Sequence, residues 1–194
     1  MVVKMGKIIA LVNQKGGVGK TTSSINLAAS LGYLGKRVLL IDLDPQGNST
    51  TGLGIDKGEI KKSIYDLLIG EAELKDVIKK TKFKNLFIIP ATISLAGADI
   101  ELMEQSRLDP EFSKSKQLKN QLALGEDMFD YIIIDCPPSL GILTTNALCA
   151  ASSVIIPVQC EFFALEGIMQ LLNSIMLTQR KLNIMVCQLW KLEQ

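Results

Sequence analysis

The residues with the clearest chemical use stand near the start of the chain, in QKGGVGKTT at residues 14–22. A short glycine-rich loop lets successive backbone N–H groups point at phosphate oxygens, and a helix beginning there adds the positive end of its dipole. Lys20 can reach the β- and γ-phosphates of a nucleotide, and the Thr21 hydroxyl can serve as a magnesium ligand. The stretch predicts a phosphate site made of Lys15, Gly16, Gly17, Val18, Gly19, Lys20, Thr21 and Thr22.

This loop departs from the strict P-loop pattern G-x-x-x-x-G-K-[ST] at one position, because residue 14 is Gln14 rather than glycine. Gly16 and Gly17 stand inside the loop instead, so the phosphate-binding chemistry is kept. The unusual feature is a second lysine, Lys15, on the other side of the glycines from Lys20. From the residues alone, Lys15 has two open roles: contact with its own nucleotide or solvent, or contact with the nucleotide of a neighbouring subunit.

Two aspartates at predicted strand ends complete a candidate hydrolysis site. Asp135 ends the apolar run YIIID, which is the setting of a Walker B acid that binds magnesium directly or through water. Asp44 precedes Pro45, which favours extended backbone and would hold the carboxylate near the γ-phosphate. The chain has no histidine, so we predict that Asp44 orients the attacking water. The metal set is then Thr21, Asp135 and Asp44. The alternative for Asp44 is a turn-forming Asp-Pro-x-Gly, and Asp42 is expected to be structural.

The elements that must position these residues alternate along the chain. Strands are predicted at 7–12, 37–42, 86–90, 131–135, 153–158 and 183–190. Helices are predicted at 21–34, 94–105, from a Ser139 cap to about 151, and at 164–179, and the lysine-rich 57–84 favours a solvated helical face. Such alternation predicts an α/β fold, a P-loop NTPase-like three-layer sandwich with a mostly parallel central sheet covered by helices on both faces. In such sheets ligands bind at the carboxyl ends of the strands, where 13–22, 42–51, 135–139 and 158–161 would meet.

Composition further limits the kinds of protein and of catalytic site that this sequence can form. The chain has 194 residues, of which 47% are hydrophobic, and we expect one domain spanning 1–194. The absence of histidine excludes a histidine general base, and no two of the four cysteines have CxxC spacing. Residues 136–160 carry no charge but include three prolines, which indicates a soluble core rather than a membrane span. With no signal peptide recognisable, we expect a cytoplasmic protein.

Five segments together resemble one family. KGGVGKTT, LIDLDPQGNST, IPATISLAGADIEL, YIIIDCPPSLGILTTNAL and IPVQCEFFALEG, between about Lys7 and Leu182, are similar to the ParA/Soj family of chromosome- and plasmid-partition ATPases, in the deviant Walker A group. The resemblance implies a slow, partner-stimulated ATPase that uses ATP and Mg²⁺ and forms an ATP-dependent homodimer. It implies that Lys15 crosses to the nucleotide of the other subunit. It also implies a ParB/Spo0J-type partner protein, no membrane, and nucleoid association through non-specific DNA binding in full-length relatives.

Other branches of the group fit less well. No cysteine precedes Cys136, so the cluster ligands of the nitrogenase iron protein are missing, and the tail lacks the tyrosine cluster of the bacterial tyrosine kinases. The end KLNIMVCQLWKLEQ has no long basic amphipathic segment of the MinD kind. The alternatives that stay open are a MinD-like nucleotide-binding regulator or scaffold with little hydrolysis, and a non-functional truncated product.

The resemblance fades after about Leu182, and members of the family run on beyond this point. We therefore expect a chain truncated at its C-terminus, lacking part of the adenine pocket and the basic residues that hold DNA. The balance of 21 Lys and Arg against 20 acids supports no nucleic-acid surface, so we expect DNA binding weaker than roughly 10⁻⁵ M at physiological salt.

Overall fold

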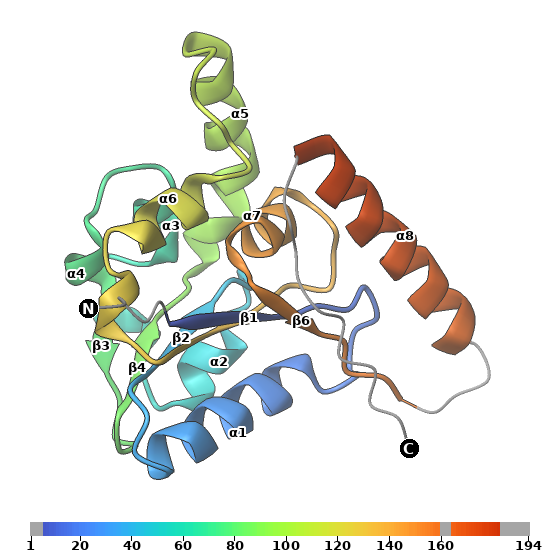
Figure 1. The fold of residues 1–194 in the computed structure, drawn as a ribbon. Helices are drawn as coiled ribbons and strands as arrows, with labels where there is room; N and C mark the ends of the chain where they lie inside the picture. The colour runs from blue at the N-terminus through green and yellow to red at the C-terminus, as the bar shows by residue number, and fades with distance from the viewer. Residues whose placement is uncertain (1–5, 160–163, 183–194) are drawn as a thin grey trace, which may run out of the picture.

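A computed structural model describes residues 6–159 and 164–182 (Figure 1). Its centre is a six-stranded sheet in the order β3-β4-β2-β5-β1-β6, in which only the β3–β4 pair is antiparallel. The strands are β1 (Lys7–Leu11), β2 (Val38–Asp42), β3 (Lys79–Lys80), β4 (Leu86–Ile89), β5 (Tyr131–Asp135) and β6 (Ser153–Ile155). The central strands β2 and β5 are apolar up to the aspartate that ends each of them, because both faces of the sheet are covered.

The register of the sheet brings the site acids to one edge. Asp42 at the end of β2 lies opposite Asp135 at the end of β5, and Leu11 at the end of β1 lies opposite Asp135 on the other side. Because these strands are parallel, the loops that follow all three emerge at the same edge. The predicted meeting of segments 13–22, 42–51 and 135–139 is therefore a property of the strand register.

Helices cover both faces of the sheet and make three layers (Figure 1). One face is covered by α1, whose Ala28 packs with Leu40 and Ile133 of the sheet, and by α2. The other face carries α3, α6, α7 and α8, and α5 projects away from the body on this side. The helices are α1 (Lys20–Tyr33), α2 (Asn48–Gly52), α3 (Ile64–Leu68), α4 (Leu74–Val77), α5 (Ala98–Leu108), α6 (Gln117–Ala123), α7 (Ile142–Ala150) and α8 (Ala164–Leu182), with 3₁₀ turns at Lys57–Glu59, Ile93–Gly97 and Glu126–Met128.

The predicted fold class is confirmed, and so are the strands near 7–12, 37–42, 86–90 and 131–135. The strand predicted at 153–158 ends at Ile155, two residues before Pro157, which cannot donate to a ladder. The helix predicted at 94–105 begins as a 3₁₀ turn and becomes α-helical only at Ala98. The strand predicted at 183–190 lies outside the described residues.

Two local predictions are wrong. Ser139 does not cap α7, which begins at Ile142 after Gly141, because the chain continues as a loop and the Gly141 carbonyl accepts the first helical bond from the Thr145 N–H. Residues 57–84 do not form a solvated helical face. They form α3, α4 and β3, because Ser63 starts a new helix with a capping box and Gly70, at φ 84°, is left-handed just after it.

Apolar residues of this segment face the core, where Ile64, Leu67, Leu68 and Val77 are fully buried. In the described part of the chain, no helix is long and apolar enough to cross a membrane.

Candidate nucleotide site

The loop between β1 and α1 has the backbone that a phosphate cradle needs. Gly17 and Gly19 have φ angles of 75° and 89°, which side-chain-bearing residues rarely adopt. Apart from the adjoining residues, no atom lies within 4 Å of where a Cβ of Gly16 or Gly17 would stand, so this side of the loop faces open space. The hollow in front of the loop is lined by Gly16, Gly17, Gly19, Lys20, Thr21, Thr22, Asp44, Gln46, Asn48 and Pro138.

Two residues of the predicted polar segments, whose individual roles the sequence did not indicate, hold this loop in place. The side-chain Oδ1 of Asn13 accepts a 3.0 Å bond from the Lys15 N–H, and the side-chain Nδ2 of Asn13 donates at 2.8 Å to the Pro157 carbonyl. The amide of Gln159 donates at 3.1 Å to the Gly17 carbonyl. Segment 158–161 was predicted to reach the site from the end of β6, and Gln159 does so; residues 160–163 lie outside the described part.

Lys20 is almost buried, with 7% of its surface exposed, and its ammonium group donates at 3.0 Å to the Lys15 carbonyl. Burial lowers the pKa of Lys20, while the charges of Asp135 and Asp44 raise it. The side chain thus lies folded along the loop, close enough to two carboxylates for their charges to act on it. Lys15 is exposed at the front of the loop, which is compatible with either of its open roles.

Asp135 is fully buried at the base of the loop and is held by hydroxyl groups. Ser24 donates to one carboxylate oxygen at 3.1 Å and Ser49 to the other at 2.7 Å, and Thr21 also hydrogen-bonds to this carboxylate. Burial raises the pKa of Asp135, and the three hydroxyl groups oppose that shift. The predicted partners Thr21 and Asp135 are therefore brought together, whereas Ser24 and Ser49 were missed.

Asp44 lines the hollow and also builds a turn. Its carboxylate accepts a 2.9 Å bond from the Gln46 N–H, and its carbonyl accepts one of 2.8 Å from the Gly47 N–H. Asp44 therefore forms the turn given above as its alternative role and also lines the hollow in front of the glycine loop. Asp42 is fully buried; burial raises its pKa to about 6, and Thr50 donates to it from both its N–H and its hydroxyl. This fits the structural role predicted for Asp42.

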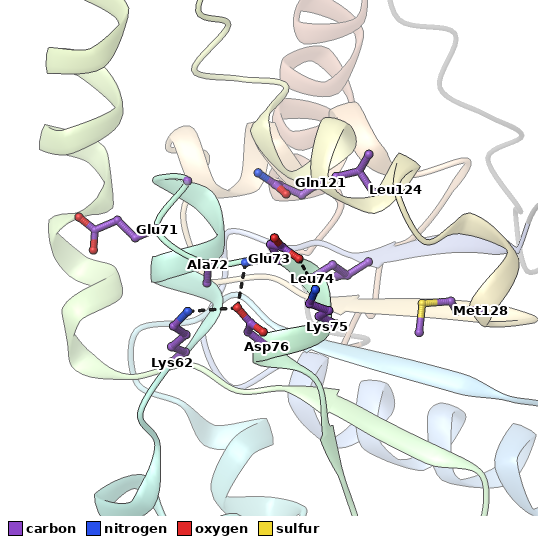
Figure 2. Close-up of a pocket in the computed structure, with 11 residues that line it drawn as sticks. Lys62, Glu71, Ala72, Glu73, Leu74, Lys75, Asp76, Gln121, Leu124 and Met128 are labelled. Carbon is purple, nitrogen blue, oxygen red and sulfur yellow. Dashed lines mark hydrogen bonds and ion pairs between the residues drawn. The ribbon is translucent and has the colours of Figure 1, made fainter.

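A second hollow, between α4 and α6, does not have this chemistry (Figure 2). Its charged side chains pair with one another, since Lys62 lies 3.1 Å from Asp76 and Lys75 lies 2.7 Å from Glu73. Figure 2 shows the other wall formed by Gln121, Leu124 and Met128. Because these cations are already neutralised by neighbouring acids, this hollow is not suited to phosphate.

Within the described residues there is no cluster of three or more His, Cys, Asp or Glu side chains that could hold a metal ion alone. Magnesium at nucleotide sites takes one or two protein oxygens and completes its shell with water and phosphate oxygens. The buried Asp135 carboxylate beside the Thr21 hydroxyl supplies such a donor set. The residues present therefore fit a magnesium ion that binds together with a nucleotide.

Comparison with known proteins identifies the family. The AAA domain family matches residues 6–187. The chain is 59% identical over 179 residues to the sporulation initiation inhibitor protein Soj of Bacillus subtilis (strain 168), covering 92% of the chain and 68% of Soj. It is 51% identical to the chromosome-partitioning ATPase Soj of Treponema pallidum (strain Nichols), covering 92% and 67%. The chain belongs to the Soj/ParA family. It spans about two thirds of the length of these Soj proteins.

A solved structure with a bound nucleotide has a similar fold. Cobyrinic acid a,c-diamide synthase from Mycobacterium smegmatis, with bound ADP and magnesium, superposes with a TM-score of 0.84 at 42% identity over 91% of this chain and 69% of that one. This synthase is less similar to the chain in sequence than the two Soj proteins are, at 42% identity against 59% and 51%. The family is therefore assigned from the Soj proteins and not from the synthase. The resemblance predicted from the five motifs is confirmed, and the roles of individual site residues stay predictions.

Proposed function

We propose that the chain is a Soj/ParA-type partitioning ATPase that hydrolyses Mg-ATP and associates with a second copy of itself around the nucleotide. The observation that carries the proposal is the meeting, at one edge of the sheet, of a left-handed glycine loop, Lys20, Asp44 and Asp135. This proposal is supported by identities of 59% and 51% to two Soj proteins, one of which is named a chromosome-partitioning ATPase.

Each side chain has a role that its position supports. Backbone N–H groups of the loop and the N-terminus of α1 bind the phosphate oxygens. Lys20 leaves the Lys15 carbonyl and turns to the β- and γ-phosphates, where it offsets developing negative charge. Thr21 and Asp135 would hold a magnesium ion, which would supply positive charge to offset that of the phosphate groups. The Asp44 carboxylate orients the attacking water and is the third protein ligand proposed for the magnesium ion.

Association of two subunits would allow Lys15 to bind the nucleotide of the partner subunit. ATP carries several negative charges, and a lysine at the front of the loop can supply a second cation to the nucleotide of the partner subunit. Hydrolysis would then weaken the dimer. We also propose a partner protein of the ParB/Spo0J type. Binding of this chain to non-specific DNA is expected to be weak, because its positive and negative side chains nearly balance.

The experiment is an equilibrium titration with a fluorescent ATP analogue, with and without Mg²⁺. The parent protein should bind the nucleotide more tightly with Mg²⁺, and Lys20→Ala should lose binding because the main cation of the loop is gone. Lys36→Ala, an exposed lysine just beyond α1, is the matched control and should behave like the parent. Unchanged affinity in Lys20→Ala would contradict the assignment of the loop.

A further inference from the structure

Two neighbouring residues of α2 carry buried hydroxyl groups that the roles above do not use. Ser49 and Thr50 are both fully buried, and they donate to two different carboxylates. The Ser49 hydroxyl donates to Asp135 at 2.7 Å, whereas the N–H and hydroxyl of Thr50 each donate to one oxygen of Asp42 at 2.7 Å. α2 thus contacts the ends of β2 and β5 at once.

Thr50 fixes the position of α2. Its hydroxyl oxygen also accepts a 3.0 Å bond from the Ala91 N–H, just after β4. The side chain therefore links the carboxyl ends of β2 and β4 inside the protein, where leaving any of these groups unpaired would cost free energy. This anchor does not involve Ser49, so the position of α2 does not depend on the bond from Ser49 to Asp135.

The Asp44 turn leads directly into α2. Asp44 accepts the N–H groups of Gln46 and Gly47, and Gly47, at φ 61°, immediately precedes the helix. Ser49 is the second residue of α2, so a short and hydrogen-bonded path joins the Asp44 turn to the carboxylate of Asp135. The other hydroxyl groups on Asp135, from Thr21 and Ser24, belong to α1 instead.

We propose that Ser49 is a positioning residue that orients the Asp135 carboxylate from the α2 side and so couples the magnesium side of the site to the Asp44 turn. This inference rests on the proposed function. A carboxylate that binds a metal or its water is aligned by the hydrogen bonds to its remaining oxygens, and loss of such a bond typically lowers metal affinity or activity about 10–100-fold. Ser24 of α1 and Ser49 of α2 hydrogen-bond to different oxygens of Asp135, and of the three hydroxyl groups only that of Ser49 belongs to the helix into which the Asp44 turn leads.

The test measures magnesium affinity directly. Mg²⁺ is titrated into each protein with a fluorescent ADP analogue at a fixed concentration, and the midpoint of the Mg²⁺-dependent signal is compared. Ser49→Ala should raise the midpoint about 10-fold or more, while its affinity for the analogue in EDTA stays that of the parent. Thr51→Ala is the matched control, because this hydroxyl lies on the same helix but donates to the Gly47 carbonyl, not to Asp135.

Coupling to Asp44 is tested by single-turnover hydrolysis in a double-mutant cycle. Ser49→Ala should slow the parent by about 10-fold but slow an Asp44→Asn background by less, since the two residues act through one path. If the Mg²⁺ midpoint of Ser49→Ala equals those of the parent and Thr51→Ala, the inference is overturned but the proposed function is not. The same holds if the effects of the Ser49 and Asp44 substitutions on the activation free energy of hydrolysis are strictly additive. Loss of analogue binding by Ser49→Ala in EDTA would also overturn it, because the residue would then be structural. A parent protein whose nucleotide affinity ignores Mg²⁺ would overturn the proposed function and this inference together.

Discussion

Asp44 combines two roles in one carboxylate, and substitution can separate them. The carboxylate accepts the Gln46 N–H and lines the hollow in front of the phosphate loop. Asparagine keeps an acceptor for this N–H but removes the charge, whereas alanine removes both. If the charge positions the attacking water, Asp44→Asn and Asp44→Ala should both bind ATP and both hydrolyse it roughly 10²-fold or more slowly.

The measurement is single-turnover phosphate release with excess protein. The parent provides the reference, and its release of phosphate decides between an ATPase and a nucleotide-binding scaffold. An Asp44→Asn protein that works at the parent rate, beside a slow Asp44→Ala, would mean that Asp44 acts only through its turn.

Some of the single residues of the candidate site could be predicted from the sequence. The glycine loop, Lys20, Asp44 and Asp135 could be predicted because they follow apolar strands whose carboxyl ends must meet in a parallel sheet. The contacts of Asn13, Ser24, Ser49 and Gln159 could not be predicted, although three of them lie in the predicted polar segments, because the partners of serine and amide side chains are set by tertiary geometry.

At the scale of elements, long apolar strands and α1 were predictable and the short elements were not. β4 and β5 have near-continuous apolar sequences, but β3 is only Lys79–Lys80 and bears no strand pattern. The helices between β2 and β4 are four or five residues long, below the length at which a helical period can be read. Capping boxes at Ser63 and Glu73 start two of them, and such signals are local.

Gly32 gives a testable consequence of how α1 packs. A Cβ at this position would lie 2.4 Å from the backbone oxygen of Lys84, and Asn85 donates to the Gly32 carbonyl at 3.2 Å. Overpacking costs about 1–3 kcal/mol, and alanine recovers about 1 kcal/mol in helix propensity. Because the clash is with backbone that cannot rotate away, the upper end of this cost applies, and Gly32→Ala should lose about 2 kcal/mol of unfolding free energy, measured by urea denaturation.

Gly97 provides the matched control, because its Cβ would meet no atom within 4 Å and its φ of −82° suits any residue. Gly97→Ala should be no less stable than the parent, because alanine fits there without a clash. Equal stability of Gly32→Ala and the parent would show that the end of α1 does not pack against residues 84–85 as described.

For the whole molecule, the account requires that ATP controls association of two chains through Lys15. Sedimentation velocity tests this most directly, with the hydrolysis-slow Asp44→Ala protein as the starting point, so that ATP stays intact during the run. Asp44→Ala should be monomeric without nucleotide and dimeric with Mg-ATP, and Asp44→Ala/Lys15→Ala should stay monomeric in both conditions, because the cation offered to the partner's nucleotide is missing. If Mg-ATP dimerises both proteins equally, or dimerises neither, the account of a nucleotide-bridged dimer is contradicted.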